Sequence, residues 1–176
     1  MNTITKRITL DAMLLALLCI IGMFSIPLGD NIKVSLQFLA VIIIFGLVDG
    51  FLDKLLITGL YLIIGLFIPV YAGFSAGITP TFGFVIGFVI SAPFFHLISL
   101  IKMPSDTLKF YIASTVSLLI TYICGSIFLA NFLNMDYIPS LSISVLPYIP
   151  FDIIKIIVGS FIVKQTRNIK PKSKSN

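Results

Sequence analysis

Long apolar stretches, separated by short polar or Gly/Pro-containing breaks, dominate the pattern along the chain. There are six of them: residues 8–26, 34–48, 55–70, 81–103, 108–132 and 148–163. A helix that crosses the bilayer core needs roughly 17–25 mainly apolar residues, and an enclosed helix can be shorter. The pattern therefore predicts an all-α membrane protein with six transmembrane helices. We expect the three short stretches either to gain a turn at each end or to be enclosed by neighbours.

The breaks between these stretches carry helix-stopping and charged residues. Residues 27–30 (Pro-Leu-Gly-Asp) end the first stretch, and Asp49-Gly50 ends the second. Lys6-Arg7 before an apolar run also resembles the start of a signal peptide, but no small-x-small cleavage site follows. We therefore interpret the first stretch as a retained helix.

Composition supports the membrane interpretation. Hydrophobic residues make up 58% of the 176 residues and charged residues only 11%, whereas soluble domains average about 25% charged residues. The net charge of +5 could suggest nucleic-acid binding, but the cations gather in loops and at the chain end. The two cysteines lie in apolar runs and do not indicate a disulfide framework. No nucleic-acid partner is expected.

The distribution of Lys and Arg predicts the orientation. Cytoplasmic loops are enriched in these residues. With six helices and both termini inside, ten of the twelve cations are cytoplasmic, Lys33 is outside and Lys155 lies within the sixth stretch. We predict one membrane domain (residues 1–163) with a basic cytoplasmic tail (164–176), in a bacterial cytoplasmic membrane. The tail either only sets the topology or also contacts anionic lipids.

Two connections on the predicted outer face stand out. Residues 71–80 form an apolar, glycine-rich loop without charge. Non-helical backbone near a membrane is tolerated where it is buried in protein, so we expect this loop to fold back over the bundle. Residues 131–147 are long enough to form a second cover on the same face.

Asp152 and Lys155 are charged residues inside an apolar stretch, which makes them candidates for a functional site. Their i, i+3 spacing places both on one helical face. They could form a purely structural ion pair, because two opposite buried charges cost less than either alone. They could equally bind a ligand through the carboxylate and the ammonium. The residues alone leave both interpretations open.

Other polar residues favour structural roles. Gln37 suits an interhelical hydrogen bond somewhat better than a ligand contact. His96 is the only histidine, so we expect a hydrogen-bonded interface residue and no metal site. Asp49 and Asp53 flank Lys54 on an inner loop, where solvated side chains are the simplest expectation.

Signals for catalysis and energy coupling are absent. The chain has no P-loop motif, no Ser/His/Asp or zinc-protease arrangement and no glutamate. We therefore expect no enzyme activity, no cofactor and an energy source supplied by partners. Ala12-x-x-x-Ala16 would let another helix approach closely, although such spacings often arise by chance.

An ordered set of short motifs is similar to the BioY family, the biotin-specific S components of energy-coupling factor (ECF) transporters. Val34-Ser35-Leu36-Gln37 resembles the family's [IV]-[ST]-L-Q. Two further segments are the most specific, and they are Pro80-Thr81-x-Gly83-Phe84-x-x-Gly87-Phe88 and Leu146-Pro147-Tyr148-Ile149-Pro150-x-Asp152-x-x-Lys155.

The resemblance implies a six-helix subunit that captures biotin from outside. It implies association with a transmembrane coupling subunit and two ATPase subunits, whose ATP hydrolysis drives release inside. Ala12 and Ala16 match the helix-one motif that packs on the coupling subunit, and residues 71–80 match the lid. The predicted ligand-binding set is Asp152, Lys155, Gln37, Tyr71, Gly73, Thr81 and Phe84.

The sequence departs from the family pattern at several positions. Phe82 replaces the first of two glycines, Phe151 replaces the glycine before the acid, and no counterpart of a carboxylate-binding arginine appears near Val85. Another small acid such as lipoate therefore remains open as the ligand. A membrane enzyme using Asp49 or Asp53, and a scaffold subunit without ligand, are the less favoured alternatives.

Overall fold

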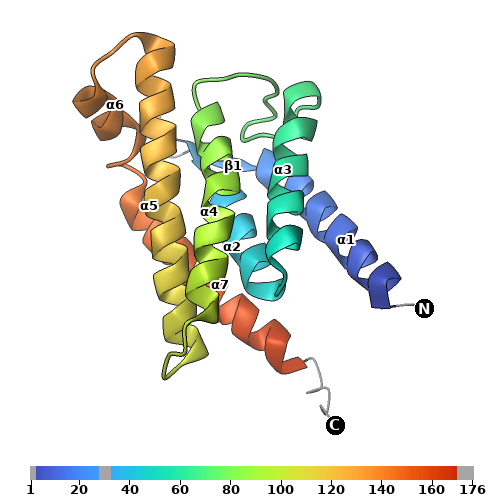
Figure 1. Cartoon of the computed structure of the whole chain (residues 1–176). Helices are drawn as coiled ribbons and strands as arrows, with labels where there is room; N and C mark the ends of the chain where they lie inside the picture. The colour runs from blue at the N-terminus through green and yellow to red at the C-terminus, as the bar shows by residue number, and fades with distance from the viewer. Residues whose placement is uncertain (1–2, 28–32, 170–176) are drawn as a thin grey trace.

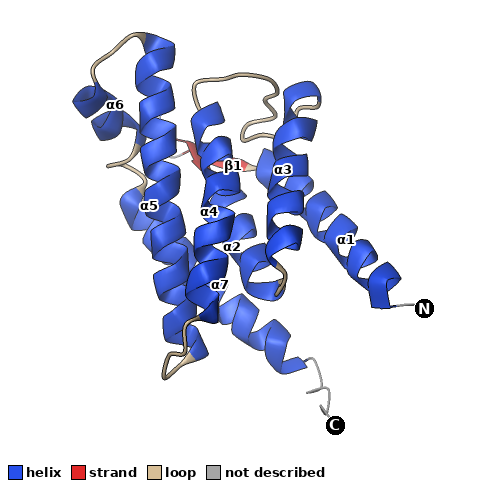
Figure 2. Cartoon of the chain, in the orientation of Figure 1, coloured by secondary structure: helices blue, strands red, loops and turns tan. Residues whose placement is uncertain are grey.

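The computed structural model describes residues 3–27 and 33–169 and is almost entirely helical. Figure 2 shows helices joined by loops, the longest of them between α3 and α4, with one small two-stranded ribbon. The helices are α1 (Thr3–Met23), α2 (Gln37–Leu47), α3 (Phe51–Phe67), α4 (Phe82–Leu100), α5 (Asp106–Leu133), α6 (Tyr137–Ser144) and α7 (Ile149–Ile169). The strands are β1 (Ser25–Pro27) and β2 (Lys33–Ser35).

Each predicted apolar stretch contains one helix of 11 to 28 residues, so the positions of six helices are confirmed. The boundaries differ in ways that packing explains. The second helix has only 11 residues, and eight of them are buried, so it is enclosed by neighbours, as one of our two expectations stated. The last helix continues past Val163 to Ile169.

The predicted end residue of the first helix is wrong. We predicted helix to residue 26, but α1 stops at Met23 and residues 25–27 pair with 33–35 as antiparallel strands. Pro27 cannot donate a helical hydrogen bond, and the ribbon supplies a different partner for this backbone. Ser25 lies opposite Ser35, which brings the chain back directly to the start of α2. Residues 28–30 of the predicted break lie outside the described residues.

The helices form a bundle in which α2 is central (Figure 1). The pair α4 and α5 runs antiparallel and packs most extensively. A Cβ atom at Gly87 would lie only 2.7 Å from the Thr121 Cα. Glycine at this position therefore lets the two backbones approach closely, as is typical of membrane helix pairs.

By length and hydropathy, two described helices qualify by themselves as membrane spans, α4 and α5. The pair α6 and α7, bent by 52° at its break, qualifies as a third if it is counted as one span. Among the described residues, α2 is an apolar helix that is too short to meet this length criterion. Many apolar side chains of α1, α3, α5 and α7 are exposed on the surface of the bundle.

Connections alternate between the two ends of the bundle. The α2–α3 and α4–α5 connections lie on the lower side of Figure 1, toward the first turn of α1 and the last turns of α7. The β-ribbon, the loop 68–81 and α6 lie at the upper end. We call these the inner end and the outer end, respectively. Lys6, Lys54, Lys102, Lys109 and Lys164 are therefore carried toward the inner end.

The segment 131–147, expected to be a second cover, instead contains α6 and packs on α5. The Ser140 hydroxyl is buried and donates to the Ser126 carbonyl at 2.7 Å. Figure 1 shows α6 beside the outer end of α5, on the side away from α4. The segment therefore widens the bundle at this end.

Candidate functional site

Asp152 and Lys155 form a buried ion pair near the outer end of the bundle. The Lys155 ammonium lies 2.6 Å from Asp152 Oδ1, and the two residues are only 8% and 5% exposed. On α5, the Tyr122 hydroxyl donates to Asp152 Oδ2 at 2.5 Å. The two carboxylate oxygens are thus held by groups from two helices, which fixes the orientation of the side chain.

This cluster keeps unused hydrogen-bonding capacity. An ionised carboxylate offers about four acceptor positions and an ammonium three donors. The described contacts use two of the acceptor positions on Asp152 and one donor on Lys155. Asp152 also lies in the first turn of α7, where the helix dipole stabilises a negative charge. The cluster therefore has acceptor positions left for N–H groups and donors left for an anionic oxygen.

A second polar group surrounds Gln37 at the start of α2. The Gln37 amide donates to the Tyr61 hydroxyl at 2.6 Å, and that hydroxyl donates to the Val70 carbonyl at 2.9 Å. Ser35 accepts from the Gln37 backbone N–H at 3.2 Å, which satisfies an open donor at the helix start. Gln37 thus makes the expected interhelical hydrogen bond, to α3.

Helix register places the two polar groups at a similar depth. Helices α2 and α7 face each other. The Ile42 side chain of α2 packs against Gly159 of α7, and the Val163 side chain of α7 packs against Gly46 of α2. From the first pair to the second, each helix advances by four residues, which is about one turn on the same helical face. The two helices therefore run parallel. One further turn back brings Phe38 to the level of Lys155. Gln37 and the ion pair therefore belong to the same layer of the bundle.

The loop 71–80 folds back onto the helices at its start. Tyr71 is 1% exposed, and its hydroxyl donates to the Leu62 carbonyl at 2.6 Å. Gly65 makes room for it, because any Cβ there would overlap the Tyr71 ring. The Gly73 N–H donates to the Met23 carbonyl at 3.0 Å, and Gly73 has a φ of +74° that glycine adopts freely. Phe74, by contrast, is exposed.

An aromatic chain links the loop with α3, α4 and α5. The Tyr71 ring lies 5.6 Å from the Tyr61 ring and 6.2 Å from Phe82, and Phe82 lies 5.7 Å from Phe128. Such edge-on pairs add to the stability gained from burial. The start of α4, the loop and Gln37 are therefore one packed unit.

Thr81 and Phe84 occupy different positions at the start of α4. Thr81 is exposed, and its hydroxyl lies 3.1 Å from the Thr79 hydroxyl. The Phe84 ring packs directly against the Gly125 backbone on α5, one turn from Tyr122. Phe84 thus packs between α4 and α5, while Thr81 lies at the rim.

Ala12 and Ala16 lie on an exposed face of α1. Leu14 and Leu18, on the opposite face, are buried in the bundle. The two alanines leave a flat surface one turn long that is open to another helix.

Two expectations for polar side chains at the inner end are wrong, those for Asp53 and His96. Asp53 is 6% exposed, and the single N–H of Arg7 Nε is shared between its two carboxylate oxygens, each 2.8 Å away, whereas Asp49 is solvated as expected. Lys54 is 1% exposed. The His96 Nδ1 atom is buried without a hydrogen-bond partner among the described residues, and its ring lies 5.7 Å from Phe51. Hydropathy could not reveal the partner of Asp53, because Arg7 lies 46 residues away in sequence.

Tyr122 and Tyr61 were missed as members of the polar groups. Both lie in apolar runs, where a tyrosine is as easily explained by packing as by chemistry. The available signal was physical: a buried Tyr hydroxyl needs a partner. Buried Asp152 and Gln37 were the obvious groups to supply one.

Comparison with known proteins agrees with this architecture. The model of the BioY family matches residues 1–172. The crystal structure of the S component for biotin from an ECF-type ABC transporter superposes with a TM-score of 0.82 at 25% identity. That match covers 96% of this chain and 95% of the other.

Three curated relatives match most of the chain over most of their own length. A biotin transporter BioY from Thermotoga maritima is 29% identical, covering 88% of this chain and 92% of the relative. A probable biotin transporter BioY from Pyrococcus horikoshii is 32% identical, covering 85% and 89%. A biotin transporter BioY2 from Lactococcus lactis subsp. cremoris is 31% identical, covering 89% and 87%.

Proposed function

Because the chain belongs to the BioY family, we propose that it is the biotin-binding S component of an ECF-type transporter. It is a multi-pass protein of the cell membrane and a transport subunit, not an enzyme. The family match over residues 1–172 carries this proposal. The buried polar cluster within a mainly apolar bundle supports it, because small-molecule sites combine apolar walls with a few placed polar groups.

Six membrane crossings with both termini in the cytoplasm are the topology we propose. Two observations support it: the helix in each of the six apolar stretches, and the Lys and Arg residues in the segments that lie at the inner end. The short helix α2 is compatible with this topology because its neighbours enclose it. The basic tail would then face the cytoplasm; its residues 170–176 lie outside the described residues.

Biotin binding uses the layer that contains Asp152, Lys155 and Gln37. The ureido ring of biotin has two N–H donors and one carbonyl acceptor, and Asp152 has acceptor positions left for such donors. Lys155 either contacts the valerate carboxylate or orients Asp152. Tyr71, Gly73, Thr81 and Phe84 form the lid and the rim, and the aromatic rings supply apolar surface.

The partners are a transmembrane coupling subunit and two ATPase subunits. The open surface at Ala12 and Ala16 supports a close helix contact with the coupling subunit. Energy has to come from such partners, because the chain contains no P-loop.

Binding of biotin to the purified full chain tests the proposal. Biotin should raise the melting temperature by mass action, and Asp152→Asn should weaken binding by about tenfold or more through loss of a charged hydrogen-bond acceptor. Asp136→Asn is the matched control, because Asp136 is an exposed acid at the same end. Absence of biotin binding by the wild type would refute the function, and unchanged binding in Asp152→Asn would refute the role of this residue.

Lipoate is the second candidate ligand, favoured only by the lack of an evident arginine for the carboxylate. Lipoate has a carboxylate but no ureido group. If lipoate raises the melting temperature and biotin does not, lipoate replaces biotin as the proposed ligand.

A further inference from the structure

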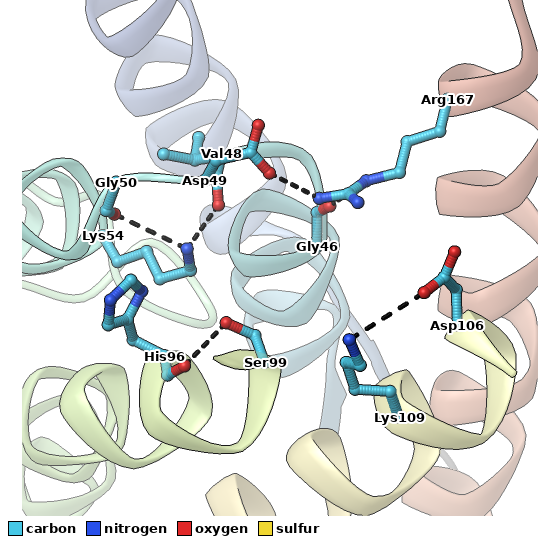
Figure 3. Close-up of polar contacts among 10 residues, drawn as sticks. All are labelled: Gly46, Val48, Asp49, Gly50, Lys54, His96, Ser99, Asp106, Lys109 and Arg167. Carbon is cyan, nitrogen blue, oxygen red and sulfur yellow. Dashed lines mark hydrogen bonds and ion pairs between the residues drawn. The ribbon is translucent and has the colours of Figure 1, made fainter. Parts of the chain in front are cut away.

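A cavity of about 310 Å³ opens at the inner end of the bundle, at the far end of α5 and α7 from the Asp152 cluster. Residues from α2, α3, α4, α5 and α7 and the α2–α3 connection line it. Its charged lining residues are Lys54, Lys109, Lys164, Arg167, Asp49 and Asp106. Figure 3 shows Lys54, Lys109 and Arg167 reaching toward one shared space from three different helices. The lining thus has a net positive charge.

The carboxylates do little to neutralise the cations inside this cavity. The side chains of Asp49 and Asp106 are 91% and 95% exposed. Asp106 lies 3.9 Å from the Lys109 ammonium, which is beyond hydrogen-bond distance. Asp49 binds Arg167 at 2.8 Å, at the solvent side.

Lys54 is the most deeply buried of these cations. Its ammonium donates to the backbone carbonyls of Val48 and Gly50, just after the end of α2. These contacts stabilise the negative end of the α2 dipole. Within the described part of the chain, no carboxylate forms an ion pair with Lys54. One of its three N–H donors is still available.

The start of α5 adds further positive potential. Asp106 and Thr107, the first two residues of α5, line the cavity. The N-cap residue Ser105 makes no side-chain capping bond, so backbone N–H groups of the first turn remain available. Such a helix start attracts anions, and here it lies next to Lys109 and Lys164.

The inner part of the cavity wall is apolar. Phe95, Phe110 and Val163 are buried residues of three helices and line the same cavity. The cavity therefore combines cations with a hydrophobic wall, at the bundle end where cations of the chain gather. A soluble anion would use the cations only, whereas an amphipathic anion would use both.

We propose that this cavity binds the phosphate group of an anionic phospholipid, with the adjoining acyl chain against the phenylalanine wall. Lys109, Lys164 and the free donors of Lys54 and Arg167 contact the phosphate. Basic pockets between membrane helices bind acidic headgroups in this way. The inference depends on neither the transported ligand nor the coupling subunits.

Native mass spectrometry of the full chain tests the proposal, using equal amounts of dioleoylphosphatidylglycerol and dioleoylphosphatidylcholine in neutral detergent. The wild type should retain phosphatidylglycerol preferentially. The double variant Lys109→Gln/Lys164→Gln should lose about fivefold or more of that preference. The control Lys6→Gln/Lys102→Gln removes the same charge from exposed residues outside the cavity and should retain it.

Three results would overturn the proposal. The wild type could show no preference for phosphatidylglycerol. Both double variants could lose the preference equally, which would indicate unspecific attraction. The cavity variant could retain the preference but fail to copurify with a coupling subunit, which would make the cavity a protein-docking site.

A separate thermal-shift experiment tests whether the bound phosphate group belongs to a lipid or to free phosphate. Inorganic phosphate at millimolar concentration should not raise the melting temperature of the wild type, whereas phosphatidylglycerol should. Equal shifts of the melting temperature would indicate that the cavity binds a soluble anion and not a lipid. Since biotin binding is measured independently, failure of the lipid proposal leaves the transport proposal intact.

Discussion

The Asp152 cluster at the outer end and the cavity at the inner end differ in how their charges are balanced. At the outer end, Asp152, Lys155 and Tyr122 form one buried cluster in which opposite charges are paired at 2.6 Å. At the inner end, cations surround a cavity while the carboxylates of Asp49 and Asp106 extend into solvent. The outer cluster is electrically balanced and held in place, whereas the inner cluster has positive charge left over. A balanced buried cluster suits a ligand with both donors and acceptors, and an unbalanced one suits an anion.

Lys155→Met should have the largest effect, because it leaves Asp152 buried without its counter-charge. Breaking a buried pair from one side costs about 3–5 kcal/mol. We expect a strongly lowered melting temperature and loss of biotin binding. The double variant Asp152→Asn/Lys155→Met removes both charges and should recover most of the stability. Equal stability of the single and double variants would show that the pair does not contribute as proposed.

Tyr122→Phe should have the next largest effect. It removes one hydrogen bond to the buried carboxylate, and hydrogen bonds to charged groups contribute about 1.5–3 kcal/mol. Thermal unfolding of the full chain measures this loss. Tyr111→Phe on the same helix is the matched control, since Tyr111 has no side-chain hydrogen bond among the described contacts. A similar loss in both variants would assign the effect to aromatic packing.

Lys109→Gln at the inner end should change stability by no more than about 0.5 kcal/mol. Its ammonium is 3.9 Å from the nearest paired carboxylate, so little is lost when the charge is removed. Phosphatidylglycerol retention should nevertheless fall. A loss of stability as large as that of Lys155→Met would remove the contrast between the two ends.

A change in salt concentration should have the smallest effect. It should weaken lipid binding at the inner end and leave biotin binding at the outer end nearly unchanged. Raising the ionic strength from about 0.15 to 1 M shortens the Debye length from about 8 to 3 Å. Phosphatidylglycerol retention should weaken, because the inner cations are partly exposed. Biotin binding should stay nearly constant, because the outer pair is buried. Equal salt dependence of both ligands would contradict this picture.

Much of the architecture could be predicted from residues alone. The apolar stretches located all six long helices, because long runs with few charges have few other stable environments. The spacing of Asp152 and Lys155 predicted their contact, since i and i+3 positions share a helical face. Gln37 was correctly expected to bond between helices.

Contacts between distant segments could not be predicted in this way. Apolar patterning shows that a residue avoids water but does not show which helix it faces. Asp53 was expected in solvent, yet Arg7, 46 residues away, binds it. The ribbon at residues 25–27 was missed because three residues carry too little periodicity to indicate a strand.

The sequence by itself determined the membrane environment, the positions of the six helices that occupy the apolar stretches, and the placement of Asp152 and Lys155 on one helical face. Only the tertiary structure decided that Tyr122, 30 residues away, completes that pair and that Lys54 is buried at the end of α2. The physical reason is the range of each interaction. Hydropathy and helical spacing act within one segment, whereas hydrogen-bond partners and net charge in a cavity depend on which segments meet.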